Sequence, residues 1–455
     1  MQAKLWMALE KNVKKNLISG HTPGHKNGHL VPEALREAWG EEVWRYDKTE
    51  IEGLDNLAHP TGALKSSMAG WARERDCAHV QYLLGGTSLG LKAAILALGR
   101  GKKIFVPRHA HHSIIEAMVL SGSEPIYLDV DFDSRLGIPL GVNLQTFKAA
   151  AEEHPDCKLM VVVHPTYHGF TYKNHWIFIE AQKMGITTIV DGAHSAHFCV
   201  TPGLTQDALS LGGDVVIESA HKTLPCLTQA SIMLIRDEAL VTPLTEAVAL
   251  LHTTSPSYLL MASLEASGVW LFGEGRAIIE KAIDQLKISK WGLGKMKHLV
   301  LEESLWWFQD PFKLYFTCPH ASGEAIGEVF RELGLECEMT DGRGALVMLP
   351  LDGAMPMALF LEADKRLATI HTPIPKPCYV KRHGKTMMSL SEAYYAQKER
   401  VALVKAKGRV AAQILEAYPP GIPLLLPGER INKSHIDAWL ASGQDEDATL
   451  LVVKN

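Results

Sequence analysis

Residues 214–235, "DVVIESAHKTLPCLTQASIMLI", decide the fold of this chain. A β-branched apolar run ends in Glu-Ser-Ala-His-Lys, and a second apolar run follows at once. Short apolar runs bounded by turn residues are typical of buried strands. We expect Lys222, at the mouth of the first strand, to lie close to apolar surroundings. A charge is costly there, so such a lysine either carries chemistry or forms an ion pair.

The same alternation of strand and helix patterns extends from about residue 80 to residue 237. β-Rich runs such as "KIFVP", "KLMVVVHPTY" and "GITTIVDGAH" are separated by helical patterns such as "LGLKAAILALG" and "NLQTFKAAAEEH". This order predicts an α/β fold with a mostly parallel sheet covered by helices. Ligands of such sheets bind at the carboxyl ends of the strands. The polar clusters "HPTYH", "DGAHSAH" and "ESAHK" all follow strand-like runs, so we expect them to meet at that edge.

Three domains are predicted along the chain. Residues 1–298 are expected to form an N-terminal arm and the large domain, which ends in a long helix or helix pair from residue 258. Residues 299–370 alternate apolar patterns with the helical stretch "GEAIGEVFRELGL", which indicates a smaller α+β domain. A proline-rich link then leads into a C-terminal subdomain, residues 371–455, with a helical pattern over residues 390–418. The proline-rich stretch "PPGIPLLLPGERI" after it excludes a helix or a central strand.

Composition excludes several classes of protein. The chain has 455 residues, of which 47% are hydrophobic and 21% charged, as is ordinary for a soluble globular protein. A net charge of -5 gives no basic surface for nucleic acid or anionic lipid. The seven cysteines form no C-x-x-C pair, so we expect neither a disulfide framework nor a zinc site, and a reducing cytosol fits best. No apolar run has the length of a membrane span.

The N-terminal stretch lacks the long apolar core of a signal peptide. Leu5, Leu9, Val13 and Leu17 recur every four residues, with lysines between them. This spacing predicts a short amphipathic helix.

Lys222 and Asp191 are the first candidates for chemistry. A lysine amine whose pKa is lowered below about 10.4 by its surroundings can form a Schiff base with an aldehyde. Asp191 follows the strand "GITTIV", where a carboxylate could keep the ring nitrogen of a cofactor protonated. The alternatives are an ion pair at a strand end for Lys222 and a turn-capping role for Asp191. An Asp at one strand end and Ser-x-His-Lys at the next is a much rarer arrangement than either residue alone.

The stretch "LLGGTSLGLKAAIL", residues 83–96, places Gly-Gly-Thr-Ser before a helical pattern. Free backbone amides and the positive end of a helix suit a phosphate, and the hydroxyls of Thr87 and Ser88 add donors. The stretch is neither a Walker A sequence nor a dinucleotide fingerprint. An ordinary N-cap is the alternative.

Two histidine-rich stretches could bind a ring or a metal. "PRHAHHS" contains His109, His111 and His112, and an imidazole can stack on an aromatic cofactor. His194 and His197 in "DGAHSAHF" are three residues apart. Neither stretch is accompanied by a cluster with metal-ligand spacing such as H-E-x-x-H, so we discount a metal site.

These motifs, together and in this order, resemble the pyridoxal-phosphate-dependent ornithine/lysine/arginine decarboxylase family of the aspartate-aminotransferase (fold type I) superfamily. The similarity covers nearly the whole chain, from "HTPGHKNG" and "EIEGLDNLAHPTG" through "GGTS", "PRHAHHS", "HPTYHG", "DGAHSAHF" and "ESAHKTLPCLTQAS" to "HTTSPSYLLMASLE" and "YPPGIPLLLPGE". The compact length is similar to that of the smaller bacterial members. The resemblance implies a mostly parallel seven-stranded sheet covered by helices, with smaller α+β C-terminal domains. Pyridoxal 5'-phosphate would bind in the large domain.

The resemblance also implies a role for each candidate residue. Lys222 looks like the Schiff-base lysine, Asp191 like the partner of the pyridinium nitrogen, and His111 like the residue stacked on the ring. Ala193 would pack on the other face of the ring, and His194 would lie near its phenolic oxygen. The residues that resemble phosphate ligands are Thr87, Ser88, Leu89 through its amide, Ser219 and His221.

Two further segments resemble parts of the family's substrate site. Thr253 to Ser255, including Thr254, match a segment that family members lend to the cofactor site of the neighbouring subunit, which implies at least a homodimer. Glu429 matches a carboxylate near the substrate channel that could pair with a basic side chain. The implied reaction is decarboxylation of arginine, lysine or ornithine to an amine and CO2 in the cytoplasm.

Two positions depart from the family pattern. The usual Asp-Glu-Ala-His reads Asp-Gly-Ala-His here, with Gly192, and the usual Asn-Pro-Thr-Tyr begins with His164. Both departures put substrate choice in doubt more than catalysis. The alternatives are another fold type I enzyme, such as an aminotransferase with Arg331 or Arg343 as its carboxylate ligand, and a non-catalytic homologue.

Overall fold

The computed structural model of the protein describes residues 1–171, 174–201, 205–302, 309–376, 384–417 and 422–454. The chain divides into two compact units. The first comprises Met1–Ala97, Ile189–Val200 and Asp207–Ala277, and the second comprises the remaining segments, Leu98–Thr188, Thr201–Gln206 and Ile278–Asn455. The predicted division into three domains stays a prediction.

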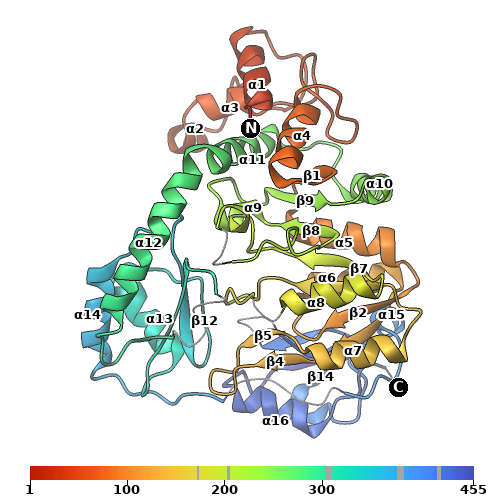
Figure 1. Ribbon diagram of the computed structural model, residues 1–455, viewed down its shortest axis with the longest axis vertical. Helices are drawn as coiled ribbons and strands as arrows, with labels where there is room; N and C mark the ends of the chain where they lie inside the picture. The colour runs from red at the N-terminus through yellow and green to blue at the C-terminus, as the bar shows by residue number, and fades with distance from the viewer. Residues whose placement is uncertain (172–173, 202–204, 303–308, 377–383, 418–421, 455) are drawn as a thin grey trace. The chain divides into compact units, whose positions relative to one another are not determined.

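A seven-stranded sheet dominates the fold (Figure 1). Its strands, in their order across the sheet, are β1 (His79–Leu83), β9 (Ser231–Ile235), β8 (Val215–Glu218), β7 (Thr187–Asp191), β6 (Leu159–Val163), β2 (Lys103–Pro107) and β3 (Glu124–Leu128). β7 pairs with β8 in parallel, and β2 pairs in parallel with β3 and with β6. β9 runs antiparallel to β1 and β8. The predicted mostly parallel seven-stranded sheet is therefore confirmed.

The first unit packs helices around the β1, β9 and β8 part of this sheet. Its helices are α1 (Lys4–Lys14), α2 (Glu33–Trp39), α3 (Glu42–Tyr46), α4 (Ala63–Arg75), most of α5 (Gly86–Gly99), α9 (Ala220–Thr223), α10 (Val241–Leu251) and α11 (Tyr258–Trp270). The amphipathic helix α1 buries Leu5, Leu9 and Val13, as predicted, against α4 and α11. Leu17 lies beyond the end of α1 and is exposed, so its inclusion in the apolar face was wrong.

The predicted long helix or helix pair is a pair. α11 and α12 (Arg276–Leu293) are joined by a π-helical turn at Leu271–Gly275. Gly273 has φ -103° and ψ -117° inside this turn, which breaks the regular helix (Figure 1, green). Among the described residues, we find no helix with the length and apolar character that crossing a membrane requires.

The second unit contains a four-stranded sheet with two helices packed on it. The strands, in order, are β10 (Val300–Leu301), β11 (Lys313–Thr317), β13 (Gly344–Met348) and β12 (Met339–Thr340), and each strand runs antiparallel to its neighbours. The helices are α13 (Gly323–Glu332) and α14 (Met357–Leu367). Phe316, Phe330 and Phe360 pack their rings together between the strands and the helices. The predicted strand–helix–strand order of this region is confirmed.

The C-terminal part of the second unit differs from the prediction. The helical pattern over residues 390–418 gives only α15 (Leu390–Tyr395), and the chain then forms β14 (Lys398–Ala402). β14 pairs antiparallel with β17 (Thr449–Val453). Pairing with a strand about fifty residues away overrides local helix propensity, which is a weak preference.

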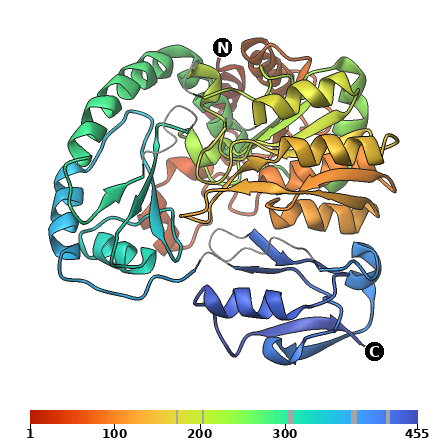
Figure 2. The same cartoon turned by 60° about the horizontal axis from the view of Figure 1, so that its bottom comes forward.

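The same C-terminal part has a small apolar core of its own. It includes Leu425, Ile431, Leu450 and Val452, with Trp439 of α16 (Lys433–Ala441) packed into it. Figure 2 shows this part in blue, with α16 beside its strands. A second pair of strands, β15 (Leu415–Ala417) and β16 (Ile422–Leu425), forms a two-stranded sheet. The remaining elements of the second unit are α6 (His112–Ser121), α7 (Leu144–Glu153), α8 (Asn174–Lys183), β4 (Val130–Phe132) and β5 (Pro139–Val142).

Candidate active site

The first unit brings Lys222, His194 and Asp191 together at the carboxyl ends of β7 and β8. Asp191 ends β7, and Lys222 lies on the short helix α9 that follows β8. Lys222 Nζ is 3.3 Å from His194 Nε2. Burial raises the pKa of Asp191, while the charge of Lys222 and the Ala193 amide lower it. These residues come from separate stretches of sequence and meet because β7 and β8 are neighbouring parallel strands.

Lys222 itself is exposed in this chain. The expectation that it lies in apolar surroundings was therefore wrong. β8 is buried along its whole length, but Lys222 comes after the strand has ended and projects from α9. Its polar neighbours are the imidazole of His194 and the carboxylate of Asp191.

The turn between β1 and α5 forms a cradle of amides and hydroxyls. Gly86 has φ +71°, a backbone conformation that glycine adopts without steric cost. A Cβ atom on Gly90 would lie 2.6 Å from Leu83 and 2.8 Å from Ile217, so α5 packs very close to β1 and β8. The positive end of α5 is thereby held at the carboxyl edge of the sheet, where it suits an anion.

Residues from two distant segments meet in this cradle. Ser219 Oγ donates to Thr87 Oγ1 over 3.2 Å, although the two residues are 132 positions apart. Burial lowers the pKa of His221 and favours its neutral form. Its Nδ1 lies 3.0 Å from the Ala230 carbonyl oxygen and therefore carries the proton, which leaves Nε2 facing away from that carbonyl. Ser88 is half-buried in the first turn of α5.

Thr253 to Ser255 follow His252, the residue that caps the C-terminus of α10, and are exposed. The Leu84 amide donates to His252 Nε2 over 3.1 Å, which anchors the start of this segment beside the end of β1. Thr253 Oγ1 accepts from the Ser255 amide over 3.2 Å. The segment thus presents Thr254 and Ser255 at the surface in a compact turn.

In the second unit, His111 caps the N-terminus of α6. Its Nδ1 accepts from the Ser113 amide over 3.2 Å, so the proton of the neutral ring is on Nε2. The ring is exposed and lies 3.9 Å, centroid to centroid, from that of His112. His109, by contrast, is buried, and burial lowers its pKa to about 4. Of the three histidines in this stretch, His111 and His112 therefore present their rings outward, while His109 stays neutral inside the protein.

Glu429 is held by a basic side chain of the protein itself. Arg108 Nη2 donates to Glu429 Oε2 over 2.7 Å, and the side chains are 8% and 2% exposed. The Leu426 amide donates to the same carboxylate oxygen over 2.9 Å. Arg108 also lies over the Tyr127 ring, 5.0 Å from its centroid. Sequence reasoning did not find Arg108 as the partner of Glu429, because 321 positions separate the two.

Comparison with known proteins identifies the family. Residues 3–325 match the family model described as "Orn/Lys/Arg decarboxylase, major domain", and residues 377–449 match "Orn/Lys/Arg decarboxylase, C-terminal domain". The chain belongs to the Orn/Lys/Arg decarboxylase family. Membership makes it an amino acid decarboxylase of the pyridoxal-phosphate-dependent class, with fold type I.

Relatives of the decarboxylase match it over nearly its whole length. An arginine decarboxylase of Halalkalibacterium halodurans is 32% identical and covers 96% of this chain and 92% of its own. An arginine decarboxylase of Bacillus anthracis is 30% identical and covers 100% of this chain and 97% of its own. The solved structure of the constitutive lysine decarboxylase of Escherichia coli has a TM-score of 0.85 and 21% identity, and covers 100% of this chain and 82% of its own. The last likeness shows that the fold is shared.

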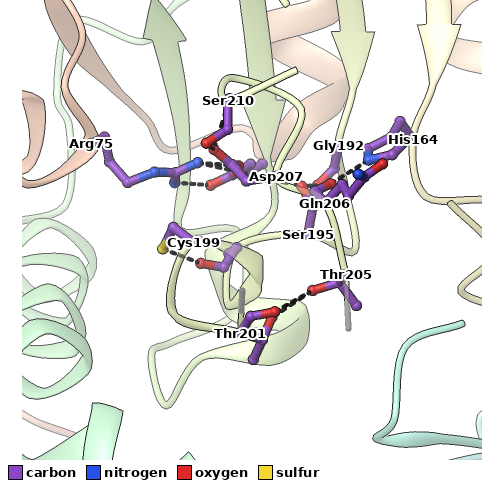
Figure 3. A network of polar contacts seen from close by, with 12 residues as sticks. Arg75, His164, Gly192, Ser195, Cys199, Thr201, Thr205, Gln206, Asp207 and Ser210 are labelled. Carbon is purple, nitrogen blue, oxygen red and sulfur yellow. Dashed lines mark hydrogen bonds and ion pairs between the residues drawn. The ribbon is translucent and has the colours of Figure 1, made fainter. Parts of the chain in front are cut away.

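The two departures from the family pattern have internal partners in this decarboxylase. His164 is fully buried in the second unit, where its Nε2 lies 2.6 Å from the Gln206 carbonyl oxygen (Figure 3). Gly192, in the first unit, lies beside Ser195, whose hydroxyl donates to the Gly192 carbonyl over 2.9 Å. Among the arginines weighed for an aminotransferase, Arg331 forms an exposed ion pair with Glu336.

Sequence reasoning missed a buried charged network of the first unit. Arg75, at the end of α4, donates to Asp207 (Figure 3). It also donates to Glu218, the residue before Ser219. The opposed carboxylates raise the pKa of Arg75 despite its burial. The only sequence signal was the glutamate in "ESAHK", since 143 positions separate Arg75 from it. Within the described part of the chain, no group of three or more His, Cys, Asp or Glu side chains could hold a metal ion.

Proposed function

We propose that this protein removes the α-carboxylate of a basic amino acid, arginine, lysine or ornithine, and releases an amine and CO2. The observation that carries the proposal is the meeting of Lys222, His194 and Asp191 at one sheet edge, in a chain of the Orn/Lys/Arg decarboxylase family. An amine for the cofactor aldehyde, an imidazole beside it and a buried carboxylate are the groups that this chemistry needs.

The residues present fit pyridoxal 5'-phosphate. The amide-rich start of α5, with Thr87, Ser88, the Leu89 amide and Ser219 Oγ, suits a phosphate dianion. A nearby phosphate favours protonation of the His221 ring. The protonated ring then donates from Nε2 as well as from Nδ1, which faces the Ala230 carbonyl. Asp191 is buried and carries one hydrogen bond from Ala193, so its second oxygen can accept from a ring nitrogen.

Each residue then has a defined task. The cofactor, when bound, supplies the electron sink that accepts the electrons of the breaking Cα–carboxylate bond. Lys222 holds the cofactor aldehyde and yields to the substrate amine. Asp191 keeps a proton on the ring nitrogen, which strengthens the sink. His194 orients the Lys222 amine, and either of them returns a proton to Cα, so the reaction consumes one proton. We assign His111 to one face of the ring and Ala193 to the other, in line with the family resemblance.

Arginine is the first substrate to test. The relatives of 30% and 32% identity quoted above are named arginine decarboxylases, and a lysine decarboxylase shares the fold at 21% identity. The assignment of Glu429 to the basic end of the substrate stays a proposal, and its pairing with Arg108 weakens it.

We further propose a homodimer, or a larger homo-oligomer, with shared active sites. The exposed Thr254 and Ser255 would then contact the cofactor site of the neighbouring subunit. The cysteines that the structure describes are all free thiols, which supports a cytoplasmic location, and Cys378 lies outside the described residues.

An absorbance spectrum and a product assay test this function. The purified protein with added pyridoxal phosphate should show a visible band that borohydride removes, and mass spectrometry should find one new amine from a panel of basic amino acids. Lys222→Ala should lose both the band and turnover, because it removes the amine that lies 3.3 Å from His194 Nε2. Keto-acid products would instead indicate an aminotransferase. A protein without the band, or a Lys222→Ala variant with unchanged turnover, would refute the proposal.

A further inference from the structure

A buried network in the first unit joins the segment that carries Lys222 to the segment that carries His194. We propose that Ser195, Glu218 and Arg75 are positioning residues that hold His194 beside Lys222, and that Gly192 is what allows Ser195 to take part. The inference rests on the proposed function, because positioning has meaning only if Lys222 and His194 act on the cofactor.

Glu218 is the centre of the network. It is the last residue of β8, is 0% exposed, and is followed directly by Ser219 and α9. Its Oε2 accepts from Arg75 Nη1 over 2.7 Å, and its Oε1 accepts from Arg75 Nη2 over 3.0 Å. Two parallel bonds between a guanidinium and a carboxylate fix both groups in position and orientation. The end of β8, from which Lys222 follows, is thereby anchored to α4.

Ser195 connects this anchor to the other segment. Its hydroxyl lies 3.2 Å from Glu218 Oε1 and 2.9 Å from the Gly192 carbonyl oxygen, so one proton is shared between two acceptors. Its amide donates to the same carbonyl over 2.9 Å. These bonds close a tight turn from Gly192 to Ser195, and His194 lies within it. The carboxylate that anchors the Lys222 segment therefore also holds the turn that carries His194.

Gly192 explains why the turn can be this tight. A Cβ atom at position 192 would lie 2.7 Å from Ser195 Oγ and 3.2 Å from the Ile217 carbonyl oxygen. Cβ atoms essentially never lie this close to another heavy atom, so a side chain at position 192 would force the Ser195 hydroxyl to move. We expect this movement to break the bond between Ser195 and Glu218. Family members usually have a glutamate where this chain has the glycine of Asp-Gly-Ala-His. In this chain, the glycine leaves the space that the Ser195–Glu218 bond needs.

Arg75 is balanced by a second carboxylate. Its Nη2 donates to Asp207 Oδ1 over 2.7 Å, and Asp207 Oδ2 accepts from the amide and the hydroxyl of Ser210, each over 3.2 Å (Figure 3). Every carboxylate oxygen of the network therefore has a donor. The Arg75 Nε atom is buried and makes no hydrogen bond within the described part of the chain. A buried network in which every carboxylate oxygen is bonded holds its side chains rigidly, and this rigidity is what positioning requires.

Ser195→Ala tests the inference, with Ser67→Ala as its matched control. Ser67, on α4, is also a fully buried serine of the first unit. Its hydroxyl lies 2.7 Å from the hydroxyl of Tyr82 on β1. Both variants lose one buried hydroxyl together with its hydrogen bonds. We expect Ser195→Ala to lower kcat about tenfold while KM changes less than about twofold, and to halve, roughly, the visible circular dichroism of the bound cofactor. Ser67→Ala should leave both unchanged, with a similar loss in thermal stability.

Gly192→Ala and the double variant Gly192→Ala/Ser195→Ala make the test specific. Gly192→Ala should reproduce the loss in kcat and in circular dichroism, because its methyl group displaces the Ser195 hydroxyl. The double variant should be no worse than Ser195→Ala alone, since alanine at 195 removes the oxygen that clashes. Additive losses would overturn the link between the two residues.

The outcomes separate this inference from the proposed function. A wild-type protein with the visible band and turnover, together with a Ser195→Ala variant that matches it in kcat and circular dichroism, would show that the network only stabilises the fold. That result would overturn the inference alone. A wild-type protein that forms no band with pyridoxal phosphate would overturn the proposed function, and the inference with it.

Discussion

The substitution Glu429→Gln tests whether the Glu429 carboxylate pairs with Arg108 or binds the substrate. Glutamine keeps the shape of the side chain and one carbonyl oxygen, but it removes the charge. Arg108 would then be a buried cation without its ion-pair partner, since the two side chains are 8% and 2% exposed and 2.7 Å apart. The Tyr127 ring, 5.0 Å from the guanidinium, offers only a weak cation–π contact in compensation.

The magnitude follows from this geometry. Removing one partner of a buried ion pair destabilises a protein by about 3–5 kcal/mol, because the other charge stays buried. The amide oxygen of glutamine can still accept from Arg108, so we expect a loss near the lower end, about 3 kcal/mol. Arg108→Met should cost a similar amount. The double variant Arg108→Met/Glu429→Gln should recover much of the loss, with a coupling free energy of about 2 kcal/mol.

Urea denaturation of the cofactor-free protein, followed by far-ultraviolet circular dichroism, measures these free energies for the four proteins of the cycle. Steady-state kinetics on arginine, lysine and ornithine run in parallel. A Glu429→Gln protein as stable as the wild type, with KM raised at least tenfold for all three substrates, would refute the reasoning. In that case the carboxylate would serve the substrate, and its bond to Arg108 would contribute little.

Two further predictions concern the cofactor site. Burial raises the pKa of Asp191 above its unfolded value of about 3.9, so folding favours the protonated carboxyl group. The stability of the cofactor-free protein therefore falls as the pH rises from the unfolded pKa of Asp191 through its higher folded pKa. In urea titrations, Asp191→Asn should therefore be more stable than the wild type at pH 7 and equally stable below about pH 3. The variant should also bind pyridoxal phosphate at least tenfold more weakly. Equal stability of the two proteins at pH 7 would contradict this prediction. Mixing inactive Lys222→Ala subunits with inactive Thr254→Ala/Ser255→Ala subunits should restore about a quarter of wild-type activity, because half of the dimers are hybrids with one complete site. No recovery after verified subunit exchange would argue against shared sites.

The strand ends of the large sheet could be predicted from the sequence because their signal is local. The apolar runs of β7, β8 and β9 stand out against the polar residues that follow them, and both β8 and β9 are buried throughout. Parallel pairing of β7 and β8 then brings Asp191 and Lys222 to one edge, whatever the details of the side chains. The glycine-rich start of α5 was equally readable, since Gly86 and Gly90 are needed by the backbone.

Elements whose state depends on a distant partner could not be predicted in this way. The stretch that forms β14 has a helical pattern, and only its pairing with β17 makes it a strand. The exposure of Lys222 depends on where β8 ends and α9 begins, a boundary that periodicity does not mark.

The sequence by itself therefore determined the α/β class, the order of the strands of the large sheet from β2 onward, and the positions of Asp191, Lys222 and His194 at or after strand ends. Only the tertiary structure decided which charges are paired: Arg75 with Glu218 across 143 positions, and Arg108 with Glu429 across 321. The physical reason is that the spacing of apolar residues encodes burial locally. A buried charge, in contrast, is satisfied by whichever opposite charge the folded chain places within hydrogen-bonding distance.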